Sequence, residues 1–224
     1  MPEIAGLSYT LKKLISLPEA LISESQRRLW TSLLKQLPPL PIGTREGRRS
    51  LLFAQSWDMK MNIENPELYA VFPYRIFGIG KDSLQIARNA FDIRVHKEDE
   101  CWYQNVADAA LLGIDSVAKK MILERAAPSR HNDSRFPAFW NSFNDWIPDI
   151  DHGGNLQIAL NYMLMQCEGK EIRLLPCWPK EWNVSFRLHA PYNTTVEAEY
   201  KNGKYEKLSV SPEERMKDVI ITDK

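Results

Sequence analysis

The sequence lacks an excess of charge of either sign, and it lacks a long apolar run. Its 29 Lys and Arg residues balance 29 Asp and Glu residues, so the formal net charge is zero. Nucleic acid is not an expected partner, because phosphate neutralisation needs a basic excess. A membrane is not an expected partner either, because no apolar run approaches about 18 residues. The first residues lack a basic stretch followed by an apolar one, so no signal peptide is expected in this chain.

Cysteine is scarce, and the common cofactor motifs are missing. Cys101, Cys167 and Cys177 show no spacing typical of a metal site, and we expect free, buried thiols. The alternative is an approach of Cys167 to Cys177 across a helix-to-strand turn. The sequence contains no P-loop, no dinucleotide-binding glycine fingerprint, no His-Glu-x-x-His and no Gly-x-Ser-x-Gly. We therefore expect neither a metal nor an organic cofactor.

The pattern of apolar residues changes near residue 170. Before that point, helical spacing recurs in segments that include 11–37 (divided at Pro18), 102–112 and 155–167. After it, short strand-like segments follow one another, with Asn202-Gly203 as a hairpin turn. Residues 44–50 are expected to form a basic loop. The sequence predicts an α+β protein, with a helical domain over residues 1–170 and a β domain over residues 171–224.

Aromatic, acidic and glycine residues gather in residues 133–155, directly before a helical segment. Loops of this composition on a rigid scaffold are typical of binding and catalytic sites. An aromatic ring covers the C–H surface of a sugar, and carboxylates bind its hydroxyls or move protons. This combination favours a polyhydroxylated ligand.

Asp151 is the strongest catalytic candidate in this region. It precedes His152-Gly153-Gly154, where small residues allow a ligand to approach the backbone. It also lies near the start of the helix expected from Asn155, whose dipole stabilises an anion. The alternative is an aspartate that only caps the helix or orders the loop. His152 is expected to bind a hydroxyl or to orient Asp151, with a structural histidine as its alternative.

Several further side chains are candidates for substrate contacts. They are carboxylates, carboxamides and indole rings, namely Glu64, Asn65, Glu67, Trp102, Gln104, Trp140, Trp146 and Asn155. Glu67 has an alternative role as the first-turn acid of a helix, where the dipole stabilises it. One of Trp140 and Trp146 is expected to belong to the core.

Two groups of motifs resemble family 95 glycoside hydrolases and their bacterial relatives. The segment IDHGGNLQIALNYMLMQ (150–166), followed by LLP and Trp182, is similar to the end of the catalytic barrel in that family. The blocks ENPELY and FPYR (64–75) and HAPYNTTVE (189–197) resemble the relatives. The resemblance covers most of the chain from residue 10 onward. His152 departs from the family pattern, which has glycine there, and the family's His-rich motif is absent at 64–69, which implies a changed pocket.

The resemblance implies a partial (α/α)6 toroid of helical hairpins followed by a small antiparallel β domain. A complete toroid needs more helices than this sequence supplies. The N-terminal half of the barrel is therefore an expected covalent or non-covalent partner. The resemblance also suggests a periplasmic or secreted bacterial parent.

The activity that the resemblance implies is hydrolysis of α-linked sugars with inversion. The substrate would be an oligo- or polysaccharide of the α-L-fucoside or α-L-galactoside type. Asp151 falls on the position of the general base, which activates water on the face of the sugar opposite the leaving group. The family's general acid, a glutamate, belongs to the earlier half of the barrel, and no residue of this chain is assigned to it. The alternative is a catalytically incomplete carbohydrate-binding or remnant protein.

Overall fold

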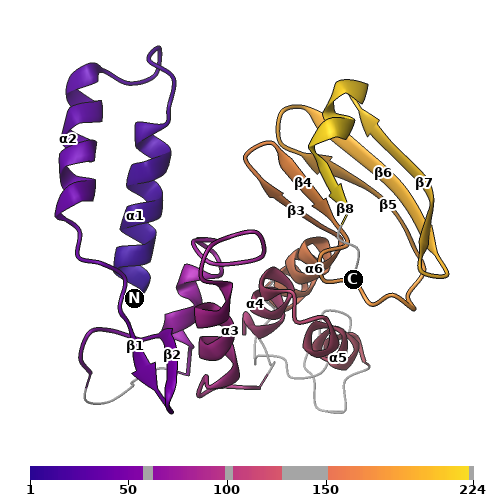
Figure 1. Cartoon of the computed structure of the whole chain (residues 1–224), viewed down its shortest axis with the longest axis horizontal. Coiled ribbons are helices and arrows are strands. Elements are labelled where there is room, and N and C mark those ends of the chain that lie inside the picture. Colours follow the sequence, from indigo (N-terminus) through magenta and orange to yellow (C-terminus); the bar gives the residue numbers. More distant parts are fainter. Residues whose placement is uncertain (58–62, 99–102, 128–150, 222–224) are drawn as a thin grey trace, which may run out of the picture. The chain divides into compact units, whose positions relative to one another are not determined.

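The computed structural model of the chain describes residues 1–57, 63–98, 103–127 and 151–221 (Figure 1). Helices, a two-stranded hairpin and two three-stranded sheets confirm the predicted α+β class. The chain forms two compact units, Met1–Lys97 and Glu98–Lys224. The predicted change from helix to strand near residue 170 falls inside the second unit, where strand β3 (Met165–Glu168) directly follows helix α6 (Asp151–Leu164).

Helices α1 (Pro2–Ile15) and α2 (Glu24–Gln36) form an antiparallel hairpin in the first unit (Figure 1). A capping box begins α2, because the Ser23 hydroxyl accepts from the Gln26 backbone N–H and the Gln26 side chain accepts from the Ser23 N–H. The Arg27 guanidinium donates to the Ile15 and Leu17 carbonyls and fixes the connection. Pro18 lies in this connection, at the point where the sequence pattern divides the segment 11–37.

A β hairpin and two helical segments complete the described part of the first unit. Strands β1 (Ile42–Arg45) and β2 (Arg48–Leu51) pair antiparallel around Glu46-Gly47, whose φ angles are 49° and 73°. Two successive left-handed residues match the twist of a tight hairpin, so the expectation of a loop over 44–50 was wrong. The 3-10 helix η1 (Pro66–Ala70) packs against α1, and α3 (Leu84–Asp92) packs against β2.

Three helices precede the strands in the described part of the second unit. They are α4 (Asn105–Leu112), α5 (Asp115–Ala126) and α6, and α4 packs against both others. Every residue of α4 is buried, and Gly113 ends the helix with a φ of 68°. The Gln166 side-chain amide, in β3 just after α6, donates to the Ala110 carbonyl of α4 at 2.9 Å and so ties β3 to α4.

Two sheets follow α6 in the second unit. Strand β3 pairs with β4 (Glu171–Leu174), which also pairs in parallel with β8 (Val219–Ile221). The other sheet contains β5 (Val184–Ala190), β6 (Thr194–Lys201) and β7 (Lys204–Ser211), and the 3-10 helix η2 (Glu213–Asp218) leads to β8. The predicted turn at Asn202-Gly203 joins β6 to β7 with φ angles of 51° and 78°. The core between the sheets consists of Ile172, Leu174, Ala190, Val196 and Val210.

Candidate functional site

Asp151 is the first residue of α6, and its side chain is exposed. The expectation that this helix begins near Asn155 was wrong by about one turn. The two glycines in the first turn disfavour helix by about 1 kcal/mol each relative to alanine. The packing of α6 on α4 outweighs that cost, and Ala159 and Met163 on the packed face are fully buried. Asp151 is therefore part of α6, whereas the sequence pattern placed it before the helix.

The two glycines in the first turn of α6 have room beside them. Apart from its chain neighbours and the helix's own backbone, a Cβ atom placed on Gly153 or on Gly154 would meet no atom of the described residues within 4 Å. The backbone N–H groups at the start of a helix carry a partial positive charge, so they stabilise an anionic carboxylate at this position. A ligand that reaches Asp151 thus also reaches the helix backbone beside it.

Asn155 lies one helical turn after Asp151, on the same face of α6. It is half-buried, whereas Ile158, one further turn along this face, is 39% exposed. The structure therefore brings the predicted base and the predicted carboxamide contact together on one helix. The backbone of His152 belongs to the same turn. Trp102, Trp140 and Trp146 lie outside the described residues.

Gln104 precedes the first residue of α4, at the N-cap position, and is half-buried. Its side chain makes no capping hydrogen bond to the helix. The next residue, Asn105, is buried, and its carboxamide donates to the Glu98 carbonyl. Gln104 thus stands at the start of a buried helix, and its role as a substrate contact stays a prediction.

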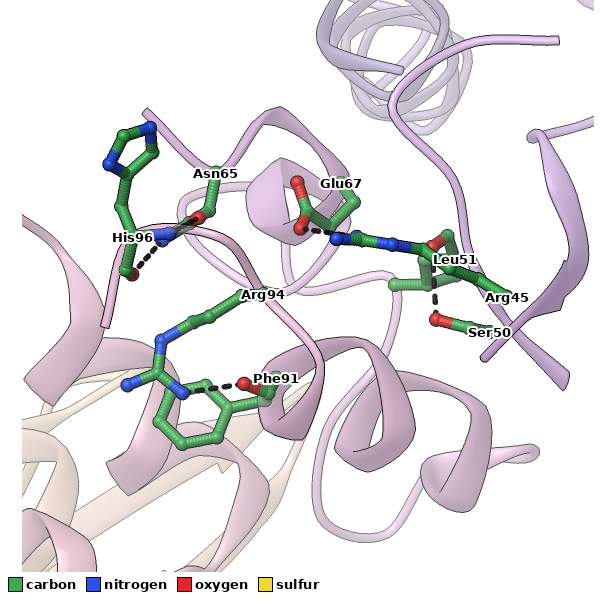
Figure 2. Close-up of polar contacts among 8 residues, drawn as sticks. All are labelled: Arg45, Ser50, Leu51, Asn65, Glu67, Phe91, Arg94 and His96. Carbon is green, nitrogen blue, oxygen red and sulfur yellow. Dashed lines mark hydrogen bonds and ion pairs between the residues drawn. The ribbon is translucent and has the colours of Figure 1, made fainter. Parts of the chain in front are cut away.

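Glu64 and Asn65, two candidates in the first unit, make local hydrogen bonds. The Tyr69 hydroxyl donates to Glu64 Oε2 at 3.0 Å. The Asn65 carboxamide donates to the His96 carbonyl at 2.7 Å and accepts from the His96 backbone N–H at 3.1 Å (Figure 2). The Asn65 side chain therefore bridges two segments that are 31 residues apart in sequence.

Glu67 is fully buried at the start of η1, and its carboxylate faces the Arg45 guanidinium at 3.5 Å (Figure 2). The Arg45 guanidinium also lies over the Phe53 ring, 4.7 Å from its centroid. Burial of a carboxylate requires a cation or strong donors. The structure thus gives Glu67 a clear role in folding, in addition to the first-turn position that its sequence context indicates.

Sequence reasoning missed the Arg45 partner of Glu67. The signal was present in the Glu46-Gly47 pair, because glycine next to a residue that tolerates positive φ favours a tight hairpin. A hairpin at that point extends β1 and directs Arg45 away from solvent, with 18% of its side chain exposed. Composition alone marked the same residues as a solvated basic loop.

Among the described residues, four ionisable groups outside the candidate set have a shifted pKa. A hydrogen bond from Arg48 lowers the pKa of Asp92, and one from Lys119 lowers the pKa of Glu181. Hydrogen bonds to Glu206 and Glu199 raise the pKa of Lys201, and burial lowers the pKa of the Met1 amino group.

Residues 1–57, 63–98, 103–127 and 151–221 contain no cluster of three or more His, Cys, Asp or Glu side chains placed to hold a metal ion. They also contain no helix that is both long enough and apolar enough to span a membrane. No disulfide joins Cys167 to Cys177, so the alternative of a pairing between them is not realised; Cys177 is buried as expected, whereas Cys167 is half-buried.

Comparisons with known proteins give the chain no family. No protein-family model matches the chain, and no curated protein is similar to it. The relation to family 95 glycoside hydrolases is therefore a hypothesis that rests only on the sequence motifs of this chain.

Proposed function

We propose that the chain is the C-terminal part of a glycoside hydrolase-like protein that hydrolyses α-linked sugars with inversion. The substrate would be of the α-L-fucoside or α-L-galactoside type. The observation that supports this proposal best is the exposed Asp151 carboxylate on the first turn of α6, near two glycines with room beside them. Asn155 on the same helix face supplies a carboxamide for a sugar hydroxyl.

In this proposal Asp151 acts as the general base. Its carboxylate accepts a proton from a water molecule, and the water oxygen forms a bond to the anomeric carbon. The glycosidic C–O bond breaks on the opposite face, and a carboxylic acid protonates the leaving oxygen. The two catalytic groups of an inverting enzyme stand about 6.5–9.5 Å apart, which leaves room for the water. The acid would come from helices of the proposed N-terminal half of the barrel.

The exposed apolar residues of α2 are a reason to propose a partner for the first unit. No residue of α2 is buried, although the helix carries three leucines and a tryptophan. Leu29 and Leu33, one turn apart, are 57% and 42% exposed. An apolar stripe on a helix normally packs against another element. The missing half of the proposed barrel would supply helices for this face.

The alternative function is a carbohydrate-binding or remnant protein without catalysis. The same exposed leucines favour it, because they are expected of a helical body that lacks its neighbours. The two readings differ in one chemical respect. Only the hydrolase requires a second carboxyl group opposite Asp151.

The test uses the complete product of the gene, including any coding sequence in frame before Met1. The product is incubated with 2′-fucosyllactose, and ¹H NMR follows the anomer of L-fucose that is released first. The hydrolase proposal expects release of the β-anomer from this α-linked substrate, because inversion reverses the configuration. Binding without release supports the carbohydrate-binding alternative, and release of the α-anomer contradicts the inverting mechanism.

A further inference from the structure

The turn between β5 and β6 holds an aromatic side chain in an unfavourable backbone conformation. Ala190 pairs with Thr194 across the turn, and Tyr192 between them has a φ of 66°. Left-handed backbone is uncommon for a bulky residue, whereas glycine or asparagine adopts it readily. Such strained residues concentrate where a side chain is needed for a function.

Packing does not explain the tyrosine at this position. The Tyr192 side chain is 61% exposed, more than Tyr9 at 38% or Trp57 at 44%. It contributes little to the core between the two sheets, whose members come from the strands. Because the ring is exposed, it stabilises the fold little, and it is available to a ligand.

The buried Arg215 guanidinium supports one face of the Tyr192 ring, at 5.3 Å from the ring centroid. Arg215 is fixed from several sides: it donates to Thr194 Oγ1 at 3.0 Å, to the Lys170 carbonyl at 3.1 Å and to the Asp218 carboxylate. Its charge is therefore satisfied without the ring. The Thr194 hydroxyl in turn donates to the Tyr192 carbonyl at 3.1 Å.

These contacts hold the ring in place before any ligand binds. A fixed ring loses little conformational freedom on binding, which is the physical basis of preorganised recognition. Asn193, the next residue of the turn, is exposed and offers a carboxamide donor and acceptor beside the ring. A flat apolar face with a polar group at its edge fits a pyranose ring, whose C–H face stacks on an aromatic ring while its hydroxyls form hydrogen bonds.

We propose that Tyr192 and Asn193 form a carbohydrate-binding site on the β domain, with the Tyr192 ring as the stacking platform. Galacto-configured sugars fit this platform best, because their C–H groups at carbons 3, 4 and 5 gather on one face. The site is distinct from the turn of α6 that carries Asp151. It depends on the proposed function only for the choice of L-fucose as the probe.

The test titrates the ¹⁵N-labelled chain with free L-fucose, which has no glycosidic bond to break. We expect the amide signals of Tyr192 and Asn193 to shift with saturation. Tyr192→Phe keeps the ring and should bind like the wild type. Tyr192→Asn removes the ring and should bind about tenfold more weakly or not at all, because the stacking contact is lost.

Thermal unfolding separates loss of the platform from loss of the fold. Asparagine tolerates left-handed backbone, so Tyr192→Asn should unfold at the same temperature as the wild type or at a higher one. Unchanged L-fucose binding by Tyr192→Asn would overturn the proposal, as would the absence of shifts at these two amides in the wild type. Asp151→Asn should leave these shifts unchanged, so the failure of the hydrolase proposal and the failure of this site are distinguishable.

Discussion

The Glu67 carboxylate is fully buried and lies 3.5 Å from the Arg45 guanidinium. The two residues are distant in sequence, because Arg45 ends β1 and Glu67 belongs to η1, which begins only at Pro66. The pair connects the β hairpin to the segment that was predicted to contact a substrate. Because the pair is buried, we expect substitution of either residue to lower the free energy of unfolding markedly.

Arg45→Leu should lower the free energy of unfolding by about 3 kcal/mol, because it removes a cation that faces a buried carboxylate. Urea unfolding at neutral pH measures the change. Adding Glu67→Gln to this variant should recover part of the loss, since the charge that needed the cation is then absent.

The matched control is Arg28→Leu in α2. Arg28 also faces a carboxylate, Glu24 at 3.6 Å, but both side chains are more than half exposed. Such pairs contribute about 0–1 kcal/mol, so the control should change stability little. Equal losses in Arg45→Leu and Arg28→Leu would contradict the buried ion pair.

Leu29→Gln should change the free energy of unfolding by less than about 0.5 kcal/mol, because the side chain is already in contact with water. Urea unfolding measures the change. Leu11→Ala on the buried side of α1 should cost about 2–5 kcal/mol. A cost for Leu29→Gln comparable to that for Leu11→Ala would show that α2 is already covered.

Arg48→Ala should raise the pKa of Asp92 toward its ordinary value, because the hydrogen bond from Arg48 is the main cause of its lowering. Because the pKa is lowered in the folded chain, the interaction stabilises the fold at pH values above the ordinary pKa of aspartate. This stabilisation is lost as the pH falls through the lowered pKa. The energetic effect is small, since the pair is exposed. An NMR titration of the Asp92 carboxyl carbon measures the shift, with Arg49→Ala as the control that leaves it unchanged.

Arg215→Lys should destabilise the second unit by about 2 kcal/mol, although the charge is kept. An ammonium group cannot reproduce the planar fork that reaches Thr194, Lys170 and Asp218 together. Guanidinium chloride unfolding measures the loss. Lys217→Ala, an exposed neighbour on η2, should stay within about 0.5 kcal/mol of the wild type and controls for the loss of a cation there.

Much of the fold follows from local sequence patterns. The α+β class, the end of α4 at Gly113 and the turn at Asn202-Gly203 were predicted because glycine and apolar spacing act over a few residues. The start of α6 was misplaced because Gly153-Gly154 disfavours a helix locally, whereas contacts with α4 sustain it.

The surroundings of the candidate residues depended on contacts between distant segments. Nothing near Asn65 in sequence indicates that its side chain holds the His96 backbone, and nothing near Glu67 indicates Arg45. Conversely, the placement of Asp151 and Asn155 on one face followed from their spacing once α6 was known to begin at Asp151.

The most direct test of the central claim compares Asp151→Asn with Asp115→Asn in the complete gene product. Asp115 is also the first residue of a helix, where its carboxylate accepts from the Ser116 N–H at 2.8 Å, so it controls for loss of a first-turn acid. Hydrolysis of 2′-fucosyllactose should fall by about 10³-fold or more in Asp151→Asn, because removal of a general base leaves water unactivated, while sugar binding is retained. Asp115→Asn should keep its turnover. Unchanged turnover in Asp151→Asn would contradict the assignment of Asp151 as the base.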